Sequence, residues 1–329
     1  MSKPRKRVRK ETYEPVGKHS AVQLCNWTKK SLKDGGVCFK EKFYGIKSHL
    51  CCQMTPSIFC NNRCIHCWRD ISNSRLDFPV KPEDPKDVLD GAINAQRKLL
   101  TGFKIDPHSK AKQLSKANQE KLAEAQNPNQ FALSLTGEPT LYPKIGELIS
   151  EIRNRNSTSF LVTNGLQPEV IQKLIDTNNL PTRLYVSVNS SNKEEHKKFH
   201  RSLKENAWEK LIETLSLFSK IKKKNTTVFR INLVKDLNMN DKFIPEFRDL
   251  IKSSHPDFIE LKGYMSVGFA RERLGYEKMP THEEMLEWIN KLEKELEGTG
   301  YILQNEHEAS RAYVMCKNKE DLIIKKEDY

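Results

Sequence analysis

Three cysteines, Cys60, Cys64 and Cys67, follow one another in a Cys-x3-Cys-x2-Cys spacing within MTPSIFCNNRCIHCWRD, residues 54–70. Three thiolates this close either share a soft metal centre or are unusually exposed thiols. Irons of an iron-sulfur cluster bind one cysteine each, so three cysteines on a four-iron cluster leave one iron open to a non-protein ligand. A zinc site needs a fourth thiolate or imidazole, and His66, between two of the cysteines, is poorly placed to supply it. The spacing therefore predicts a 4Fe-4S cluster.

This motif, preceded by a short apolar run, resembles that of the radical S-adenosylmethionine superfamily. The resemblance implies that the open iron chelates S-adenosylmethionine and that one electron from the cluster cleaves it to a 5'-deoxyadenosyl radical. In that family an aromatic residue usually precedes the last cysteine, whereas this chain has His66 there, next to Trp68. The departure weakens the expected packing on adenine at this position and does not affect the cluster.

A second group of cysteines, Cys25, Cys38 and Cys51, follows in two steps of 13 residues, with Cys52 adjacent to the last. The steps are too wide for a local zinc knuckle. The three residues converge on one metal if the segment wraps around the start of a barrel, and otherwise they are scattered buried thiols. The stretch CFKEKFYGIKSHLCCQMTP, together with CNNRCIHCWRD, is similar to archaeal 4-demethylwyosine synthases. That resemblance, which runs from about residue 20 to beyond residue 270, implies a second 4Fe-4S cluster on these three cysteines.

The same resemblance implies a reaction. Hydrogen is taken from the methyl of 1-methylguanosine at position 37 of phenylalanine tRNA, and the carbon radical adds to pyruvate before ring closure gives 4-demethylwyosine. The implied cofactors are two 4Fe-4S clusters and S-adenosyl-L-methionine. The chain has no flavodoxin-like domain, so an external electron donor is expected. Two alternatives stay open: a radical enzyme acting on another RNA or a peptide, and a non-catalytic zinc module that binds RNA.

Composition and charge narrow the classes of partner for this 329-residue chain. Hydrophobic residues make up 37%, enough for a sizeable core. Lys and Arg outnumber Asp and Glu by 56 to 43, and the net charge of +13 favours a polyanion such as RNA, or else serves only solubility. No apolar run approaches the roughly 20 residues that span a bilayer, and no signal peptide is recognisable. Eight cysteines then indicate metal or redox chemistry in a reducing cytoplasm, with no membrane partner.

Apolar stretches after the cysteine motif alternate between strand and helix patterns. Counting a strand before Cys60, the chain has six βα units, which build a parallel sheet with helices outside it. Six units are too few for the closed eight-stranded barrel. The predicted fold class is therefore α/β, a (βα)6 partial TIM barrel of the radical S-adenosylmethionine type with N- and C-terminal extensions. The expected strands after the motif are 131–135, 160–164, 184–189, 228–234 and 258–265.

Four segments are expected along the chain, and the third contains a polar, lysine-rich insertion at 101–130 that is either a solvated loop or an RNA-facing flap. The C-terminal segment should contain a helix with a Thr281 and Glu284 capping box, a few short strands, and Cys316 in the core. The segments are a basic mobile tail (1–20), the part carrying the second set of cluster ligands (21–53), the partial barrel (54–270) and a C-terminal extension (271–329).

Polar residues at the carboxyl ends of the strands are the candidates for binding S-adenosylmethionine, because active sites of such sheets gather there. The segment 136–139 resembles the Gly-Gly-Glu-Pro motif of the superfamily, which meets the amino group of S-adenosylmethionine; its alternative is an ordinary βα turn. The other candidates are plausible ribose and carboxylate contacts, although such residues usually satisfy backbone groups. The full set is Thr136, Gly137, Glu138, Pro139, Thr163, Asn164, Ser187 and Asn189.

Three lysines near the expected cavity are candidates for a Schiff base with pyruvate: Lys40, Lys42 and Lys262. A lysine held among apolar neighbours has a lowered pKa and attacks carbonyl groups. Enzymes similar to this one take a two-carbon unit from pyruvate, and we expect chelation to the second cluster, ahead of a lysine, to hold it. Arg271 and Arg273 are candidates for contacts to nucleotide or RNA phosphate, or are solvated surface charges.

Overall fold

The computed structural model describes residues 13–72, 74–103, 117–221 and 225–329. Its centre is a ten-stranded sheet in the order β1-β2-β3-β4-β5-β6-β7-β8-β10-β9. The middle strands, β3 to β8, are parallel to one another. They are β3 (Cys51–Thr55), β4 (Gln130–Leu133), β5 (Thr158–Thr163), β6 (Arg183–Ser187), β7 (Thr226–Leu233) and β8 (Phe258–Gly263).

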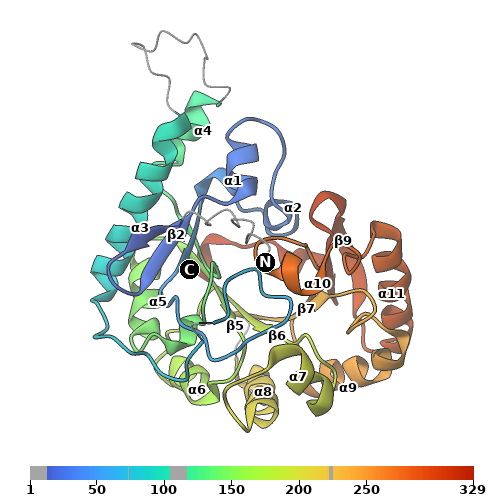
Figure 1. Ribbon diagram of the computed structural model, residues 1–329. Helices are drawn as coiled ribbons and strands as arrows, with labels where there is room; N and C mark the ends of the chain where they lie inside the picture. Colours follow the sequence, from blue (N-terminus) through green and yellow to red (C-terminus); the bar gives the residue numbers. More distant parts are fainter. Residues whose placement is uncertain (1–12, 73, 104–116, 222–224) are drawn as a thin grey trace, which may run out of the picture.

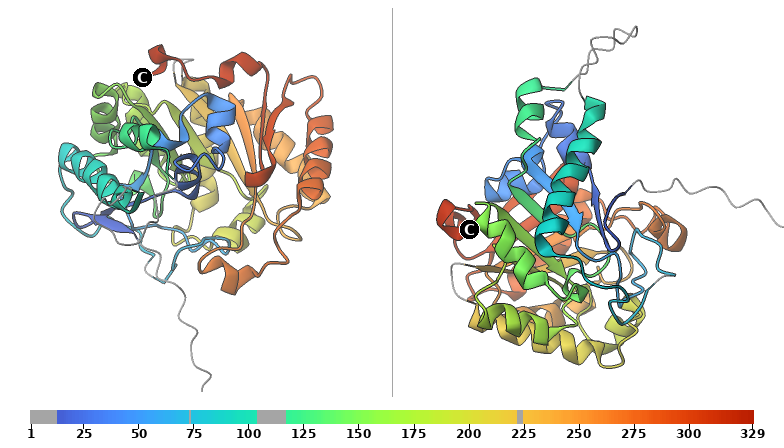
Figure 2. Two further views of the ribbon diagram at one scale, coloured as in Figure 1. Left: turned by 90° about the horizontal axis from the view of Figure 1, so that it is seen from above. Right: turned by 90° about the vertical axis from the view of Figure 1, so that its left-hand side faces the viewer.

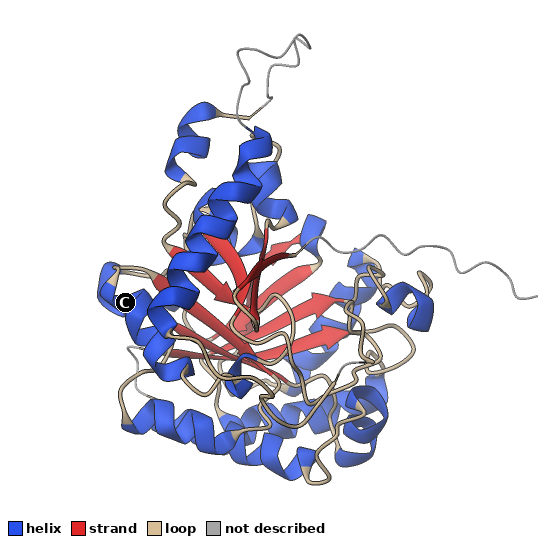
Figure 3. Ribbon diagram, turned by 60° about the vertical axis from the view of Figure 1, so that its left-hand side comes forward, coloured by secondary structure: helices blue, strands red, loops and turns tan. Residues whose placement is uncertain are grey.

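Helices follow these strands and cover the outer side of the sheet (Figures 1 and 3). α3 packs on α5, α6 on α8, and α9 on α11. Their apolar faces and the outward-facing side chains of the strands form the larger hydrophobic core. The helices are α3 (Pro85–Leu100), α5 (Ile145–Asn154), α6 (Pro168–Asp176), α7 (Lys193–His200), α8 (Ala207–Ser216), α9 (Ile244–Ser254), α10 (Ala270–Leu274) and α11 (His282–Glu295).

Side-chain caps mark the start of two helices, and one of them is the predicted capping box. The Asp84 side chain accepts a hydrogen bond from the backbone N–H of Lys86 at the start of α3. Thr281 and Glu284 form the expected capping box of α11. Both satisfy N–H groups that have no partner within the helix, so these starts are encoded locally.

Antiparallel strands extend the sheet at both edges. β9 (Ile302–His307) and β10 (Ala312–Cys316) continue it beyond β8, and Cys316 is buried in the core as predicted. At the other edge, β1 (Glu14–Val16) pairs with β2 (Ser20–Gln23), and β2 with β3. β1 lies inside the segment expected to be a tail up to residue 20. Burial of Val16 and His19 holds β1 against the sheet, so the predicted tail is wrong for this part of the segment. Residues 1–12, the rest of the predicted tail, lie outside the described part of the chain.

Short helices close the open side of the barrel. α1 (Asn26–Ser31) and α2 (Phe39–Tyr44) lie above the inner face of the sheet, and α4 (Gln119–Glu124) is the described helix of the predicted insertion (Figure 2). The rings of Phe39 and Phe43 pack with the inward-facing Phe160, Tyr185 and Phe258. Together they fill the interior of the barrel near the amino ends of the parallel strands. Side chains further along the strands therefore face a chamber that this apolar layer closes from below. Within the described ranges, no helix combines the length and apolar content needed to cross a membrane.

Candidate functional site

A cavity at the carboxyl ends of the parallel strands is lined by all three cysteines of the motif, Cys60, Cys64 and Cys67. The other walls are loops that follow β4, β5 and β6, which meet at this edge of the sheet. Cys60 is buried, and the other two are partly buried. The predicted convergence of the motif with the strand ends is therefore present.

The loop carrying these cysteines is held by backbone bonds from distant parts of the chain. Arg63 and Ile65 donate their N–H groups to the carbonyls of His200 and Phe199, over 2.9 and 3.0 Å. Arg273 donates from its guanidinium to the carbonyls of Ile65 and Cys67. Arg273 thus binds the motif loop, in a place where the sequence suggested contacts to phosphate.

The buried thiols fit a metal cluster better than reactive free cysteines. Burial raises the pKa of Cys60 to about 11 and that of Cys64 well above its usual value, so neither ionises alone at neutral pH. Metal binding displaces such protons and compensates the thiolate charge. Burial opposes the charge of Arg69, but the neighbouring Cys60 and Cys67 raise its pKa, so a fixed cation also faces the thiols.

A zinc site and an iron-sulfur cluster differ in how their ligands are arranged. Within the described ranges, no three His, Cys, Asp or Glu side chains are placed to bind one metal ion. A structural zinc draws four ligands around a single centre. A four-iron cluster instead holds its cysteines apart, at separate irons. Three thiols that line one cavity are compatible with ligands of separate irons.

Most of the predicted S-adenosylmethionine contacts line the same cavity. They are Thr136, Gly137, Glu138, Thr163, Asn164, Ser187 and Asn189. Pro139 is buried and does not line the cavity. Ser187 and Asn189 also face the neighbouring chamber. Their positions make them available to a cofactor, and their role as contacts stays a prediction.

Glu138 is engaged by protein groups. Its Oε1 accepts bonds from the N–H and hydroxyl of Thr140 and from the hydroxyl of Thr163, and its Oε2 accepts from the N–H of Asn164 at 2.8 Å. Burial raises its pKa, although these bonds oppose the shift. The carboxylate therefore ties the turn after β4 to the end of β5. It fixes the position of the Asn164 backbone at the edge of the cavity.

Gly137 holds this turn against the motif loop. Its φ is +71°, and a Cβ built there would lie 1.9 Å from the carbonyl oxygen of Ser57. Glu138 donates its N–H to the carbonyl of Phe59 over 2.7 Å. A side chain at residue 137 would thus force apart the two segments that line the cavity.

A second chamber, of about 430 Å³, lies inside the barrel and is lined by Cys25, Cys38 and Cys51. It shares a continuous wall with the first cavity, because the two have seven lining residues in common: His66, Cys67, Trp68, Ser134, Val162, Ser187 and Asn189. Strand alternation turns Cys51 toward the chamber and Cys52 into the outer core. The three cysteines separated by steps of 13 residues therefore converge, as the wrapped-segment interpretation expects.

Two of the three candidate lysines face this chamber. Lys40 and Lys262 line it, with their ammonium groups 4.6 Å and 4.5 Å from the ring centroids of Phe160 and Phe39. Burial, with the nearby Arg230 charge, lowers the pKa of Lys262 to about 8. Lys42 instead donates to the carbonyl of Glu306 over 2.6 Å, outside the chamber.

Burial raises the pKa of the Cys38 thiol and raises that of Cys51 to about 12, and the Lys40 ammonium is the largest opposing influence on both. Lys262 has a smaller influence on Cys38. Lys40 also lies close to Cys38 in the chain, two residues after it at the start of α2.

Comparisons with known proteins identify the family. Residues 54–244 match the radical SAM superfamily model, and 253–317 match the model for wyosine base formation. The chain is 40% identical to the S-adenosyl-L-methionine-dependent tRNA 4-demethylwyosine synthase of Pyrococcus horikoshii, over 95% of this chain and 88% of that protein. The chain belongs to the tRNA 4-demethylwyosine synthase family. The mouse protein of the same name, TYW1, is 35% identical over 96% of this chain and 42% of its own length.

Solved structures of this synthase family agree with the fold. The structure of TYW1 with a lysine-pyruvate adduct bound superimposes with a TM-score of 0.79 and 33% identity, covering 95% of this chain and 94% of that one. The crystal structure of archaeal TYW1 gives 0.74 and 30%, covering 95% of each. The predicted partial barrel is therefore confirmed.

His200 was not singled out from the sequence, although it contacts the motif. Its Nδ1 lies 3.2 Å from the Sγ of Cys64, and its ring is buried. A thiolate has no proton to give, so His200 must donate when Cys64 is a cluster ligand. No local pattern reveals this pair, because 136 residues separate the partners.

We expect replacement of His200 by Leu to make the first cluster harder to reduce, because a hydrogen bond to a thiolate favours the more negative, reduced state. His200→Asn, which keeps an N–H donor, should lie between Leu and wild type. Potentiometric titration followed by electron paramagnetic resonance measures the potential, in a Cys25→Ala background to simplify the signal. An unchanged potential in the Leu variant would show that this bond does not tune the cluster.

Proposed function

We propose that this chain uses S-adenosylmethionine and pyruvate to convert 1-methylguanosine at position 37 of phenylalanine tRNA into 4-demethylwyosine. Family membership supports the tRNA product, and one structural observation supports the two-substrate chemistry. Two cysteine triads face adjoining cavities with a shared wall. One cavity can bind S-adenosylmethionine while the other holds the carbon donor next to the target base.

The residues present suit two clusters. Cys60, Cys64 and Cys67 would hold the first, and Cys25, Cys38 and Cys51 the second. When bound with S-adenosylmethionine, the first cluster supplies the electron for radical formation. An external donor must provide that electron, in keeping with a cytoplasmic location. The protein's own part is to position the reactants and to exclude water with apolar walls such as Phe39, Trp68 and Val162.

We propose that pyruvate forms a Schiff base with Lys40, which changes our expectation that chelation alone holds it. The relative solved with a lysine-pyruvate adduct supports a lysine. Lys40 is favoured over Lys262 because it lines the chamber with the three thiols and lies two residues after Cys38, at the start of α2; pyruvate bound there would lie beside the second cluster. The amine adds to the ketone carbon and water leaves, so the first product is an imine with the pyruvate carboxylate intact.

The decisive experiment removes one cluster at a time. Replacing Cys25, Cys38 or Cys51 with Ala should roughly halve the bound iron and stop product formation while reductive cleavage of S-adenosylmethionine stays measurable. The matched control is Cys52→Ala, one residue away but buried in the outer core. Iron assay, circular dichroism and product mass with labelled pyruvate are measured together on anaerobic protein. Near wild-type product from all three variants would contradict the second cluster.

The same assay tests the substrates. Product should require both methylated tRNA and pyruvate, and label from pyruvate should appear in the modified base. A product formed without either substrate would favour a radical enzyme acting on another RNA or a peptide.

A further inference from the structure

A third cavity, of about 530 Å³, adjoins the chamber on the side of α1. We call it the Trp27 pocket. Trp27, Lys262 and Met265 line both the pocket and the chamber, so these side chains form the partition between them. A ligand in this pocket would therefore lie next to whatever occupies the chamber.

The Trp27 pocket is cationic. Lys29, Lys30 and Lys33 of the α1 segment line it, and its lining includes no acidic residue. None of the three lysines forms an ion pair with a described residue. The nearest acid in sequence, Asp34, is already bonded to Lys121 over 2.6 Å. No described carboxylate therefore neutralises these three charges, although the Lys33 ammonium lies 5.4 Å from the ring centroid of Phe103.

Aromatic and hydroxyl groups complete the lining. The Trp27 indole is partly buried, with the edge of His307 against it and the Lys30 ammonium 4.5 Å from its ring centroid. Ser310 also lines the pocket; it is 6% exposed, and its hydroxyl has no hydrogen-bond partner in the described part of the chain. Lysines beside an aromatic ring and an unused hydroxyl match a nucleotide, with its phosphate, base and ribose.

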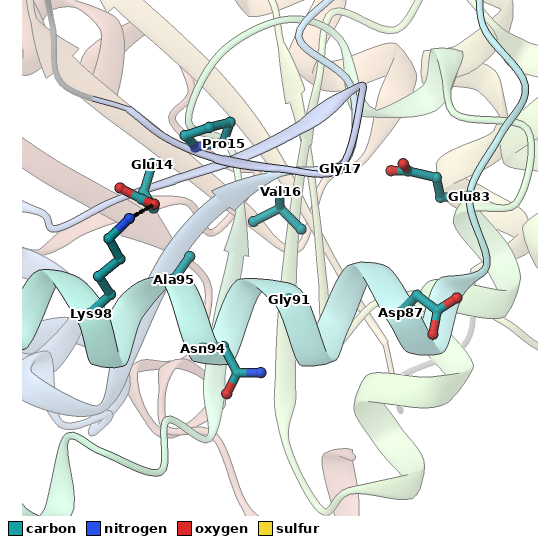
Figure 4. Close-up of a pocket in the computed structure, with 10 residues that line it drawn as sticks. All are labelled: Glu14, Pro15, Val16, Gly17, Glu83, Asp87, Gly91, Asn94, Ala95 and Lys98. Carbon is teal, nitrogen blue, oxygen red and sulfur yellow. Dashed lines mark hydrogen bonds and ion pairs between the residues drawn. The ribbon is translucent and has the colours of Figure 1, made fainter.

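A comparison within the molecule shows that this character is local. The cavity between β1 and α3 is similar in size, about 500 Å³, but Glu14, Glu83 and Asp87 line it and Lys98 is paired with Glu14 (Figure 4). Carboxylates there would repel a phosphate, and that cavity does not adjoin the chamber. Of these two pockets, only the one beside the chamber suits a polyanion.

We propose that the Trp27 pocket binds the nucleotide next to the target base, with its phosphate at Lys29 and Lys33 and its base against Trp27. This inference rests on the proposed function, because it requires a guanosine of a tRNA loop in the chamber. The neighbouring nucleotide is joined to that guanosine through one phosphate, and the pocket lies across one layer of side chains. Single-stranded loops are commonly recognised by stacking on aromatic rings combined with basic contacts.

The test measures binding of the intact protein, loaded with iron, to an anticodon stem-loop RNA by fluorescence anisotropy across a salt series. The double variant Lys29→Ala with Lys33→Ala should lose about tenfold in affinity, and its salt slope should fall by about 0.7 for each phosphate that the protein no longer neutralises. The charge-matched control, Lys317→Ala with Lys319→Ala, changes lysines next to β10 at the opposite end of β8 and should bind like wild type. Equal affinity of the two double variants would overturn the proposal.

Two further measurements locate the contact. Methylphosphonates at the phosphates flanking the target nucleotide should weaken binding to wild type but not further weaken binding to the Lys29 and Lys33 variant. Trp27→Leu should weaken binding at every salt concentration, and Trp27→Phe should restore most of it. If methylphosphonates weakened binding to the double variant as much as to wild type, the phosphate contact would lie elsewhere. If the Trp27→Leu and Trp27→Phe variants bound equally well, the base would not stack on Trp27. Failure of wild type to bind this RNA at all would instead reject the proposed function, and this proposal with it.

Discussion

Replacing any one of Cys60, Cys64 and Cys67 with Ala should abolish reductive cleavage of S-adenosylmethionine. Each substitution removes the only protein ligand of one iron in the cluster that delivers the electron. The loss should be complete, because the surrounding residues supply no substitute thiol at that cavity. Anaerobic turnover with dithionite, followed by quantification of 5'-deoxyadenosine, measures it.

Cys316→Ala is the matched control for this experiment. Cys316 is also buried, but it lies in the core beside Val314 and Leu322, far along the chain from the motif. Its loss should cost some stability through a small cavity and leave iron content and cleavage unchanged. Cleavage retained by any of the three motif variants, with iron confirmed absent from that cluster, would refute the assignment.

The sheet and its helices were predictable because their signals are local. A strand is recognised by alternating apolar and polar residues, and a helix by apolar residues at helical spacing. Both patterns can be read from a short stretch of sequence. The caps at Asp84 and Thr281 are equally local. The sequence does not predict β1, because its three residues adjoin a strongly charged tail. This strand is held in place by pairing with β2 and by the buried hydrogen bond between His19 and the carbonyl of Pro56, neither of which is a local pattern.

In the candidate site, too, the local features could be predicted and the long-range contacts could not. The spacing of Cys60, Cys64 and Cys67 shows that they share a centre, whereas their supports are distant in sequence. Arg273 reaches the carbonyl of Cys67 across 206 residues, and His200 reaches Cys64 across 136. A single sequence holds no pattern for such pairs, since each depends on how α10, which carries Arg273, and α7, which carries His200, are placed beside the motif loop.

For the candidate lysines, the sequence could not predict the direction of the side chain. Lys40 and Lys42 lie on α2, where residues two apart point in different directions. The sequence could not say which of them faces inward. Packing of Phe39 and Phe43 into the lower core sets the rotation of this helix, and it turns Lys40 into the chamber and Lys42 toward β9.

Lys40→Ala should abolish product formation and the borohydride-trapped pyruvate adduct, while S-adenosylmethionine cleavage persists. Borohydride reduces the imine to a stable amine, so peptide mass spectrometry identifies the lysine that carried pyruvate. Lys42→Ala is the matched control, since it removes the same charge two residues away and outside the chamber; it should retain adduct and product. Lys262→Ala should retain the adduct and lower the rate, because Lys262 lies on the partition between the chamber and the Trp27 pocket.

The outcomes separate the three ways of holding pyruvate. Loss of the adduct in the Lys262 variant, with retention in the Lys40 variant, would transfer the Schiff base to Lys262, whose pKa of about 8 leaves an appreciable neutral fraction near neutral pH. Wild-type protein that makes product but never traps an adduct would favour chelation by the second cluster alone. In that case Cys25, Cys38 and Cys51 would be needed for pyruvate to bind, and Lys40 would contribute only its charge.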